Sequence, residues 1–282
     1  MDSKLDTPVP TVTTPLRRNS GGTPSLRRAG GAMRRVPEIT VVFWITKVLT
    51  TAMGEATSDF LVHRIDPFLA VALGGVGLLV ALVLQFSVRR YVPWAYWLAV
   101  VMVAVSGTMA ADVLHIEFGI PYSVSTAFFA VVLAAVFVLW QRSEKTLSIH
   151  SITTWHREAF YWATVMATFA LGTAAGDMTA TTLHLGYLLS GVVFTVLIAV
   201  PALAHRLFHV NAILSFWSAY IVTRPLGASF ADWMGKPHSW GALGWGDAPV
   251  SLGLTVLIVA CGAYLSVTRG DARDGVALAG SR

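Results

Sequence analysis

Long apolar stretches separated by short polar segments form the basic pattern of this chain. Residues 68–86, 127–140, 188–204 and 250–267 contain no Asp, Glu, Lys or Arg. A helix needs about 20 mostly apolar residues to cross a hydrocarbon core of about 30 Å, and these stretches with their apolar flanks reach that length. The pattern therefore predicts membrane-spanning helices rather than the elements of a soluble core.

A second regularity is a motif made of an aromatic residue, Trp, nine residues, Gly, three residues, a small residue and Asp. It occurs four times, each time with fifteen residues from Trp to Asp, and each copy is followed by another apolar segment that ends at arginine. Such copies predict tandem repeats of a two-helix unit. The motif residues are Trp44, Gly54, Ser58 and Asp59, then Trp97, Gly107, Ala111 and Asp112, then Trp162, Gly172, Gly176 and Asp177, and finally Trp217, Gly227, Ala231 and Asp232.

The repeats predict an all-α membrane protein with eight transmembrane helices in four hairpins. Because each repeat crosses twice, the copies run in the same direction and are related by an axis along the membrane normal. Basic residues gather on the side of both termini, which the positive-inside rule makes cytoplasmic. The expected helices are 37–60 and 66–88, 93–114 and 121–141, 158–183 and 185–205, and 210–232 and 249–268.

The composition of the remaining segments completes the predicted organisation. A Thr-, Pro-, Ser-, Gly- and Arg-rich start indicates a disordered cytoplasmic tail, and no secretory signal is evident. The net charge of +5 follows the topology, so we expect a bacterial inner-membrane protein that contacts lipid and a small ion or small molecule, without nucleic acid or cofactor. A homo-oligomer is compatible with the sequence. The predicted parts are tail 1–36, repeats 37–90 and 91–142, a cytoplasmic linker 143–157, repeats 158–206 and 207–269, and tail 270–282.

All the charges inside the predicted membrane region lie on the first helix of a repeat. Ionisable groups in a bilayer face the bundle interior or a wet cavity, so we expect these four helices to form an inner ring with the second helices outside. Four aspartates at one depth favour a cation site or proton relay. The alternative is a set of half-solvated caps at the outer helix ends. The candidate binding residues are Glu55, Asp59, Asp112, Asp177, Asp232, Lys47 and Arg224, with the five carboxylates as candidate metal ligands.

The other conserved features of the motif suggest structural roles. The tryptophans Trp44, Trp97, Trp162 and Trp217 fit an aromatic belt at headgroup level. The glycines Gly54, Gly107, Gly172 and Gly227, each followed by a small residue one turn later, allow helices to approach closely. One histidine follows each motif aspartate, either as an interfacial residue or as part of an outer vestibule that is sensitive to pH or collects metal. These histidines are His63, His115, His184 and His238.

Copies one and four depart from the common pattern. Lys47, Glu55 and Asp59 share one helix face with Thr51 because they are spaced by four residues. Arg224 lies two turns before the last motif aspartate, and Pro225 predicts a kink between them. Five interior carboxylates against two cations favour binding a cation, and oxygen ligands suit hard ions such as magnesium, manganese or calcium.

Three functions compete for this charge pattern. The first is a secondary transporter or exporter of a divalent cation of the manganese or magnesium class, with proton coupling as an option. The second is a proton-coupled carrier of a small organic anion held by Lys47 and Arg224. The third is an intramembrane enzyme or sensor that uses paired carboxylates, although no nucleophile motif accompanies them. We therefore expect a protein that is not an enzyme.

The fourfold motif resembles a family of bacterial multi-pass membrane proteins made of four tandem two-helix repeats of unknown function, each with a marked Trp. The resemblance covers about residues 38–268 and rests on the four Trp residues with their Gly and Asp partners. It implies the repeat architecture and supplies no substrate.

Overall fold

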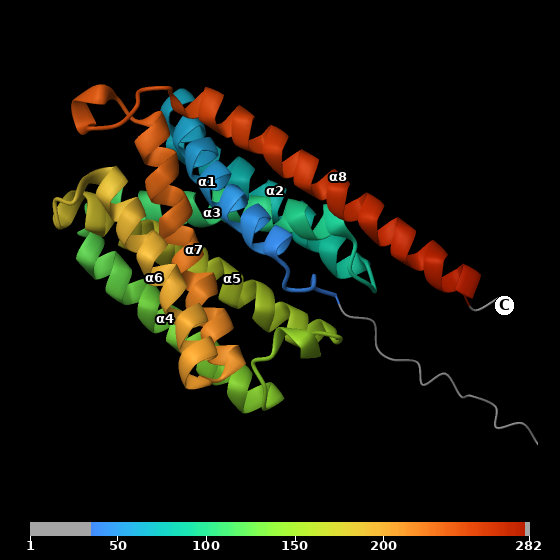
Figure 1. The fold of residues 1–282 in the computed structure, drawn as a ribbon. Helices are drawn as coiled ribbons and strands as arrows, with labels where there is room; N and C mark the ends of the chain where they lie inside the picture. Colours follow the sequence, from blue (N-terminus) through green and yellow to red (C-terminus); the bar gives the residue numbers. More distant parts are fainter. Residues whose placement is uncertain (1–34, 280–282) are drawn as a thin grey trace, which may run out of the picture. The chain divides into compact units, whose positions relative to one another are not determined.

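The computed structural model describes residues 35–279, with side chains up to residue 266. This part of the chain folds into eight α-helices without a strand, which confirms the predicted all-α class (Figure 1). Nearly all of the predicted N-terminal tail, and the last three residues, lie outside the described residues. The helices are α1 (Val41–Arg64), α2 (Pro67–Ser87), α3 (Pro93–Ile116), α4 (Tyr122–Glu144), α5 (Trp155–Asp177), α6 (Gly186–Phe208), α7 (Ala212–Gly235) and α8 (Asp247–Ala279).

Capping side chains explain where the helices differ from the predicted ranges. The Thr40 hydroxyl accepts a hydrogen bond from the backbone of Phe43, so α1 begins at Val41 rather than at 37. Thr154 caps α5 in the same way, so α5 begins at Trp155, three residues before its predicted start. A π-helical turn, Met178–Thr182, continues α5 beyond its motif aspartate. The helical backbone therefore reaches or passes the aspartate in every repeat.

The odd-numbered helices form the predicted inner ring. α1 packs against α3, α3 against α5, α5 against α7, and α7 against α1, which closes the ring. The motif glycines lie at these contacts. A Cβ on Gly107 would come within 2.8 Å of the Cβ of Phe169 in α5, and one on Gly227 would meet the backbone of Ala52 in α1. The predicted role of the glycines in close helix approach is confirmed.

The even-numbered helices lie outside this ring, but their partners differ from the predicted hairpins. α2 packs mainly on α3, α4 on α5, α6 on α7, and α8 on α1, whereas the two helices of one repeat share few contacts. Figure 1 shows α6 beside α7 and α8 along α1. The second helix of each repeat thus packs on the first helix of the next repeat, and α8 of the last repeat packs on α1 of the first.

Five helices are long and apolar enough to cross a membrane: α2, α3, α4, α6 and residues Asp247–Ser266 of α8. The four outer ones leave most of their apolar side chains exposed, as lipid-facing helices do. The other three, α1, α5 and α7, contain every buried charged residue of the described chain except Asp112 of α3. The membrane character predicted from the apolar stretches is therefore supported by these five helices.

Aromatic side chains fill the ring at the end where the odd helices begin. Tyr96 and Tyr161 are fully buried and their hydroxyl oxygens lie 2.5 Å apart. Trp97, Trp162 and Trp217 are each only 4% exposed. The aromatic-belt interpretation is therefore wrong for these three tryptophans, because the motif aromatics pack against one another in the interior. Exposed indoles at this end come instead from Trp94 and Trp155.

Candidate functional site

Residues at matching repeat positions build layers across the ring. The position after each motif glycine holds Glu55, Thr108, Thr173 and Ala228. One helical turn later comes the layer of Asp59, Asp112, Asp177 and Asp232. Because the odd helices pack in register through their glycines, each layer brings four helices together at one depth.

A cavity of about 480 Å³ lies at the aspartate end of the ring. All four motif aspartates and Glu55 line it, so the structure brings together the five carboxylates that the sequence selected. Thr182 and Trp240 also line the cavity and are themselves exposed, which places them at its rim. Tyr122, Tyr187 and Lys236 are further polar residues of the wall.

The carboxylates of the cavity are mostly withdrawn from solvent. Glu55, Asp59, Asp112 and Asp232 are at most 9% exposed, and Asp177 is half-buried at the end of α5. The alternative of half-solvated helix caps therefore does not hold for Asp59, Asp112 and Asp232. Charged groups buried at this depth need a compensating partner or a ligand.

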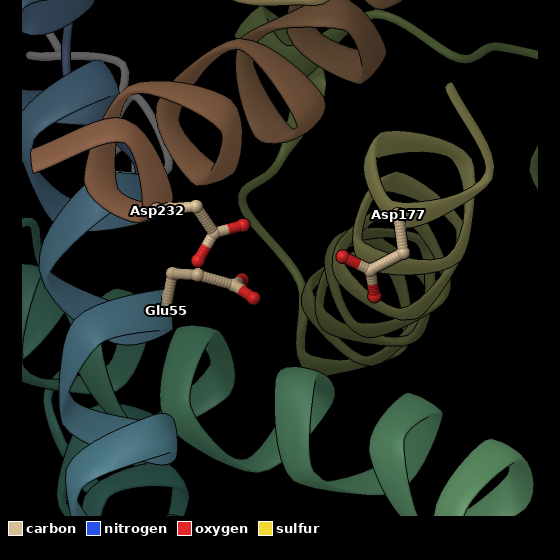
Figure 2. Close-up of side chains that lie close together, drawn as sticks. All are labelled: Glu55, Asp177 and Asp232. Atoms are coloured by element: carbon tan, nitrogen blue, oxygen red, sulfur yellow. The ribbon is translucent and has the colours of Figure 1, made fainter. Parts of the chain in front are cut away.

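Three of these carboxylates converge on one point. Figure 2 shows Glu55 of α1 beside Asp232 of α7, with Asp177 of α5 facing them. One oxygen from each lies within 4.8 Å of the other two. An ion at the centre would be at most about 2.8 Å from each oxygen, compared with about 2.0–2.6 Å in magnesium and calcium sites. A contraction of about 0.2–0.8 Å would therefore bring the three oxygens to coordination distance, as part of the ligand set of a hard divalent cation.

A lysine beyond α7 supplies part of the charge balance. The Lys236 ammonium lies 2.6 Å from Asp59 Oδ2 and 3.9 Å from Asp232 Oδ1. Burial alone would lower the pKa of Lys236, but the carboxylates of Asp59 and Asp232 outweigh burial and raise that pKa above its usual value. Among the described residues, Asp112 and Asp177 have no basic partner within 4.0 Å. With all five carboxylates ionised, the cavity would carry an excess of negative charge.

Arg224 lies in the layer just beneath the cavity, called the floor from here on, and contacts the cavity wall through Glu55. Its Nη2 lies 2.5 Å from Glu55 Oε2 and donates to the hydroxyls of Thr108 and Thr173, while Nη1 donates to the Thr51 carbonyl. The guanidinium from repeat four therefore contacts the same layer in the other three repeats. α7 continues through Pro225, which packs against Gly172 and Gly176 of α5.

Lys47 lies deeper, on the side of the floor away from the cavity. It is fully buried, with its ammonium 3.9 Å from the ring centre of Phe169 and 4.3 Å from that of Tyr220. Its Nζ has no hydrogen-bond partner among the described residues. Of the seven predicted site residues, Lys47 and Arg224 are the two that do not line the cavity.

The four histidines beyond the aspartates do not form one vestibule. His63 and His115 line the cavity, whereas His184 and His238 are absent from its wall. The Nδ1 atoms of His63 and His115 each contact a backbone carbonyl, at Asp59 and Ile120. His115 also stacks on Tyr122, with ring centres 3.6 Å apart.

The sequence alone did not predict that Lys236 and Glu158 belong to buried clusters of charged residues. Lys236 could have been found from its position four residues after Asp232, the spacing of neighbours on one helix face. Glu158, at the start of α5, is fully buried, and its carboxylate binds Arg35 at 2.5 Å and the Gln85 amide at 2.7 Å. This cluster has no signal at the level of the repeat, because the equivalent positions are not acidic.

Comparison with known protein families gives one match. The model described as Repeat of Unknown Function (DUF347) matches residues 42–91, 95–146, 160–210 and 215–271. The four matches follow the four repeats and together cover well over half of the chain. A search of curated proteins and a search of solved structures each gave no significant match.

Proposed function

Because the chain belongs to the DUF347 repeat family, whose function is unknown, we propose a function from the cavity itself: secondary transport of a divalent cation of the manganese or magnesium class across a membrane. The observation that carries the proposal is the convergence of five carboxylates from four helices on one cavity, three of them within 4.8 Å of one another. The donors are all oxygen atoms, which suit hard cations rather than soft metals.

The charge balance supports a cation over an anion. Five carboxylates line the cavity, with Arg224 paired to Glu55 and Lys236 paired to Asp59. The remaining carboxylates attract positive ions into a site with low-dielectric walls. A divalent cation would neutralise much of this charge.

The anion-carrier alternative assigns the substrate to Lys47 and Arg224, but neither lines the cavity. The terminal nitrogens of Arg224 already donate hydrogen bonds to Glu55, to two threonine hydroxyls and to one backbone carbonyl. Lys47 is enclosed by aromatic rings. An anion would have to displace these contacts, so the geometry favours the cation. No feature of the described residues favours the enzyme or sensor hypothesis over transport.

A carrier fits the axial arrangement better than an open pore. The carboxylate cavity occupies one end of the ring, while Arg224, Lys47 and the aromatic layer fill the ring beyond it. Ions that enter the cavity therefore meet a closed floor. Transport would require a second conformation in which this floor opens and the cavity mouth closes.

The ring also supports eight membrane crossings. α3 is one of the five apolar spans, and α1, α5 and α7 match it in length and pack in register with it. If α3 crosses the membrane, the odd helices that pack in register with it lie at the same depth. All four odd helices would therefore span the membrane. The positive-inside rule then favours cytoplasmic termini in a bacterial inner membrane, with the cavity on the outer side.

Calorimetric titration of the purified, full-length protein with Mn²⁺ tests the binding site. We expect Asp177→Asn and Asp232→Asn each to weaken binding by at least about tenfold, because each removes a charged ligand of the converging trio. Asp66→Asn is the matched control. Asp66 is an exposed cap of α2, and asparagine caps a helix equally well. Equal affinity in all three variants and the unmodified protein would contradict the proposal.

A further inference from the structure

Lys236 is held so that its side chain, rather than its backbone, can move. Its backbone N–H donates to the Asp232 carbonyl at 2.8 Å, and its carbonyl accepts from Gly244 at 2.9 Å. The flexible four-carbon stem of a lysine then carries the ammonium into the cavity wall. The ammonium could swing towards the exposed rim near Trp240 without disturbing α7.

The contacts of the ammonium overlap with the cation site. Lys236 Nζ lies 2.6 Å from Asp59 and 3.9 Å from Asp232, and Asp232 is one of the three converging carboxylates. A cation bound by Glu55, Asp177 and Asp232 would therefore share a ligand with the lysine. Two positive charges at such a distance repel each other, so the site favours one or the other.

A second observation is that Lys236 does not pair with every buried carboxylate of the cavity. Asp112 lines the cavity, is more than nine-tenths buried, and has no basic partner within 4.0 Å among the described residues. The Ser58 hydroxyl donates to the Asp112 carboxylate over a long distance of 3.5 Å. Burial of this carboxylate is favourable only when a bound cation or a proton neutralises its charge.

We propose that Lys236 is a tethered counter-cation that occupies part of the carboxylate site when it is empty and is displaced when a divalent cation binds; this inference rests on the proposed function. The displaced lysine releases Asp59, which then joins the ligand set. When the cation leaves, Lys236 returns and partly neutralises the empty site. An empty carrier with less buried negative charge can change conformation at a lower cost.

The 2.6 Å contact between the Lys236 ammonium and Asp59 agrees with this role, because it places a positive charge on a carboxylate of the site. A purely structural ion pair between α1 and α7 would have a different signature. Its loss would destabilise the fold and leave the affinity for cations unchanged or weaker.

Calorimetric titration with Mn²⁺ distinguishes the two roles. Repulsion between a unit charge and a divalent ion about 6 Å away corresponds to about tenfold in affinity even in a high dielectric, so Lys236→Gln should bind Mn²⁺ at least about tenfold more tightly. Asp59→Asn combined with Lys236→Gln should remove most of this gain, because Asp59 can no longer join the ligands. Lys145→Gln is the matched control. Tyr122, the first residue of α4, lines the cavity, and Lys145 follows the last residue of the same helix, about 34 Å away along its axis.

The outcomes separate this inference from the proposed function. Tighter binding by Lys236→Gln, with Lys145→Gln unchanged and the melting temperatures similar, supports the tethered cation. Mn²⁺ binding by the unmodified protein without a gain in Lys236→Gln overturns the tethered cation and leaves the cation site standing. Absence of Mn²⁺ binding in both proteins overturns the proposed function and this inference with it.

Discussion

The ion pair at the floor of the cavity offers a quantitative test of the fold. Arg224 and Glu55 are both buried, and the guanidinium also donates to Thr51, Thr108 and Thr173. Replacing Arg224 by Met keeps the approximate length of the side chain and removes its charge. Glu55 would then be an uncompensated charge beneath four further carboxylates.

The size of the effect follows from these contacts. Removing one partner of a buried ion pair costs about 3–5 kcal/mol, because the other charge remains desolvated. We therefore expect Arg224→Met to lower the free energy of unfolding by about 3–5 kcal/mol. The double variant Glu55→Gln with Arg224→Met removes both charges and should regain most of that loss. Arg224→Lys should have a stability between those of Arg224→Met and the unmodified protein. It keeps the positive charge, but one ammonium cannot reach all four oxygen partners of the guanidinium.

Denaturant titration in detergent micelles, followed by tryptophan fluorescence, measures these differences; the chain has 10 Trp residues. Glu55→Gln should stabilise the protein that already carries Arg224→Met, so the sign of the coupling between the two substitutions is predicted. It would be refuted if the double variant were no more stable than Arg224→Met, or if Arg224→Met unfolded within about 1 kcal/mol of the unmodified protein.

Three further predictions concern packing, the opposite end of the ring and topology. Gly227→Ala should lower the melting temperature in a thermal unfolding assay, because the new Cβ meets Thr51 and the Ala52 backbone; Gly253→Ala in α8, where a Cβ has open space, should leave it unchanged or raise it. Glu158→Gln should destabilise the protein by about 2–4 kcal/mol in denaturant titration, because Arg35 loses its buried partner, and an unchanged midpoint would show that this pair is dispensable. In a Cys261→Ala background, Ser239→Cys should react with an impermeant thiol reagent from outside intact cells, and Lys145→Cys only after permeabilisation; the reverse pattern would invert the proposed orientation.

The sequence predicted the ring and its carboxylates because both follow from periodicity. Asp112 and its three equivalents occupy one position of a fixed repeat, and a buried charge must face inwards in a bilayer. The same periodicity does not say which neighbour a helix packs against. The pairing of α2 with α3, and of α8 with α1, depends on three-dimensional contacts such as the 2.6 Å hydrogen bond between Thr57 and Ser251.

The missed residues share another property: each reaches its partner from outside the repeat motif. Lys236 extends into the cavity from the loop after α7, and Arg35 reaches Glu158 from the segment before α1. The burial of Trp97 was also missed, because an indole near a predicted helix start fits a membrane interface as well as an aromatic core. Long side chains and irregular segments are the parts of a structure that local sequence spacing constrains least.

Flux of Mn²⁺ into proteoliposomes, read by an entrapped metal-sensitive dye, measures cation transport by this protein itself. The account predicts saturable, protein-dependent uptake that Asp177→Asn reduces at least about tenfold, because the cation loses a charged ligand, while Asp66→Asn transports normally. Protein-free rates in vesicles that contain the folded, unmodified protein, for Mn²⁺ and Mg²⁺ alike, would contradict it.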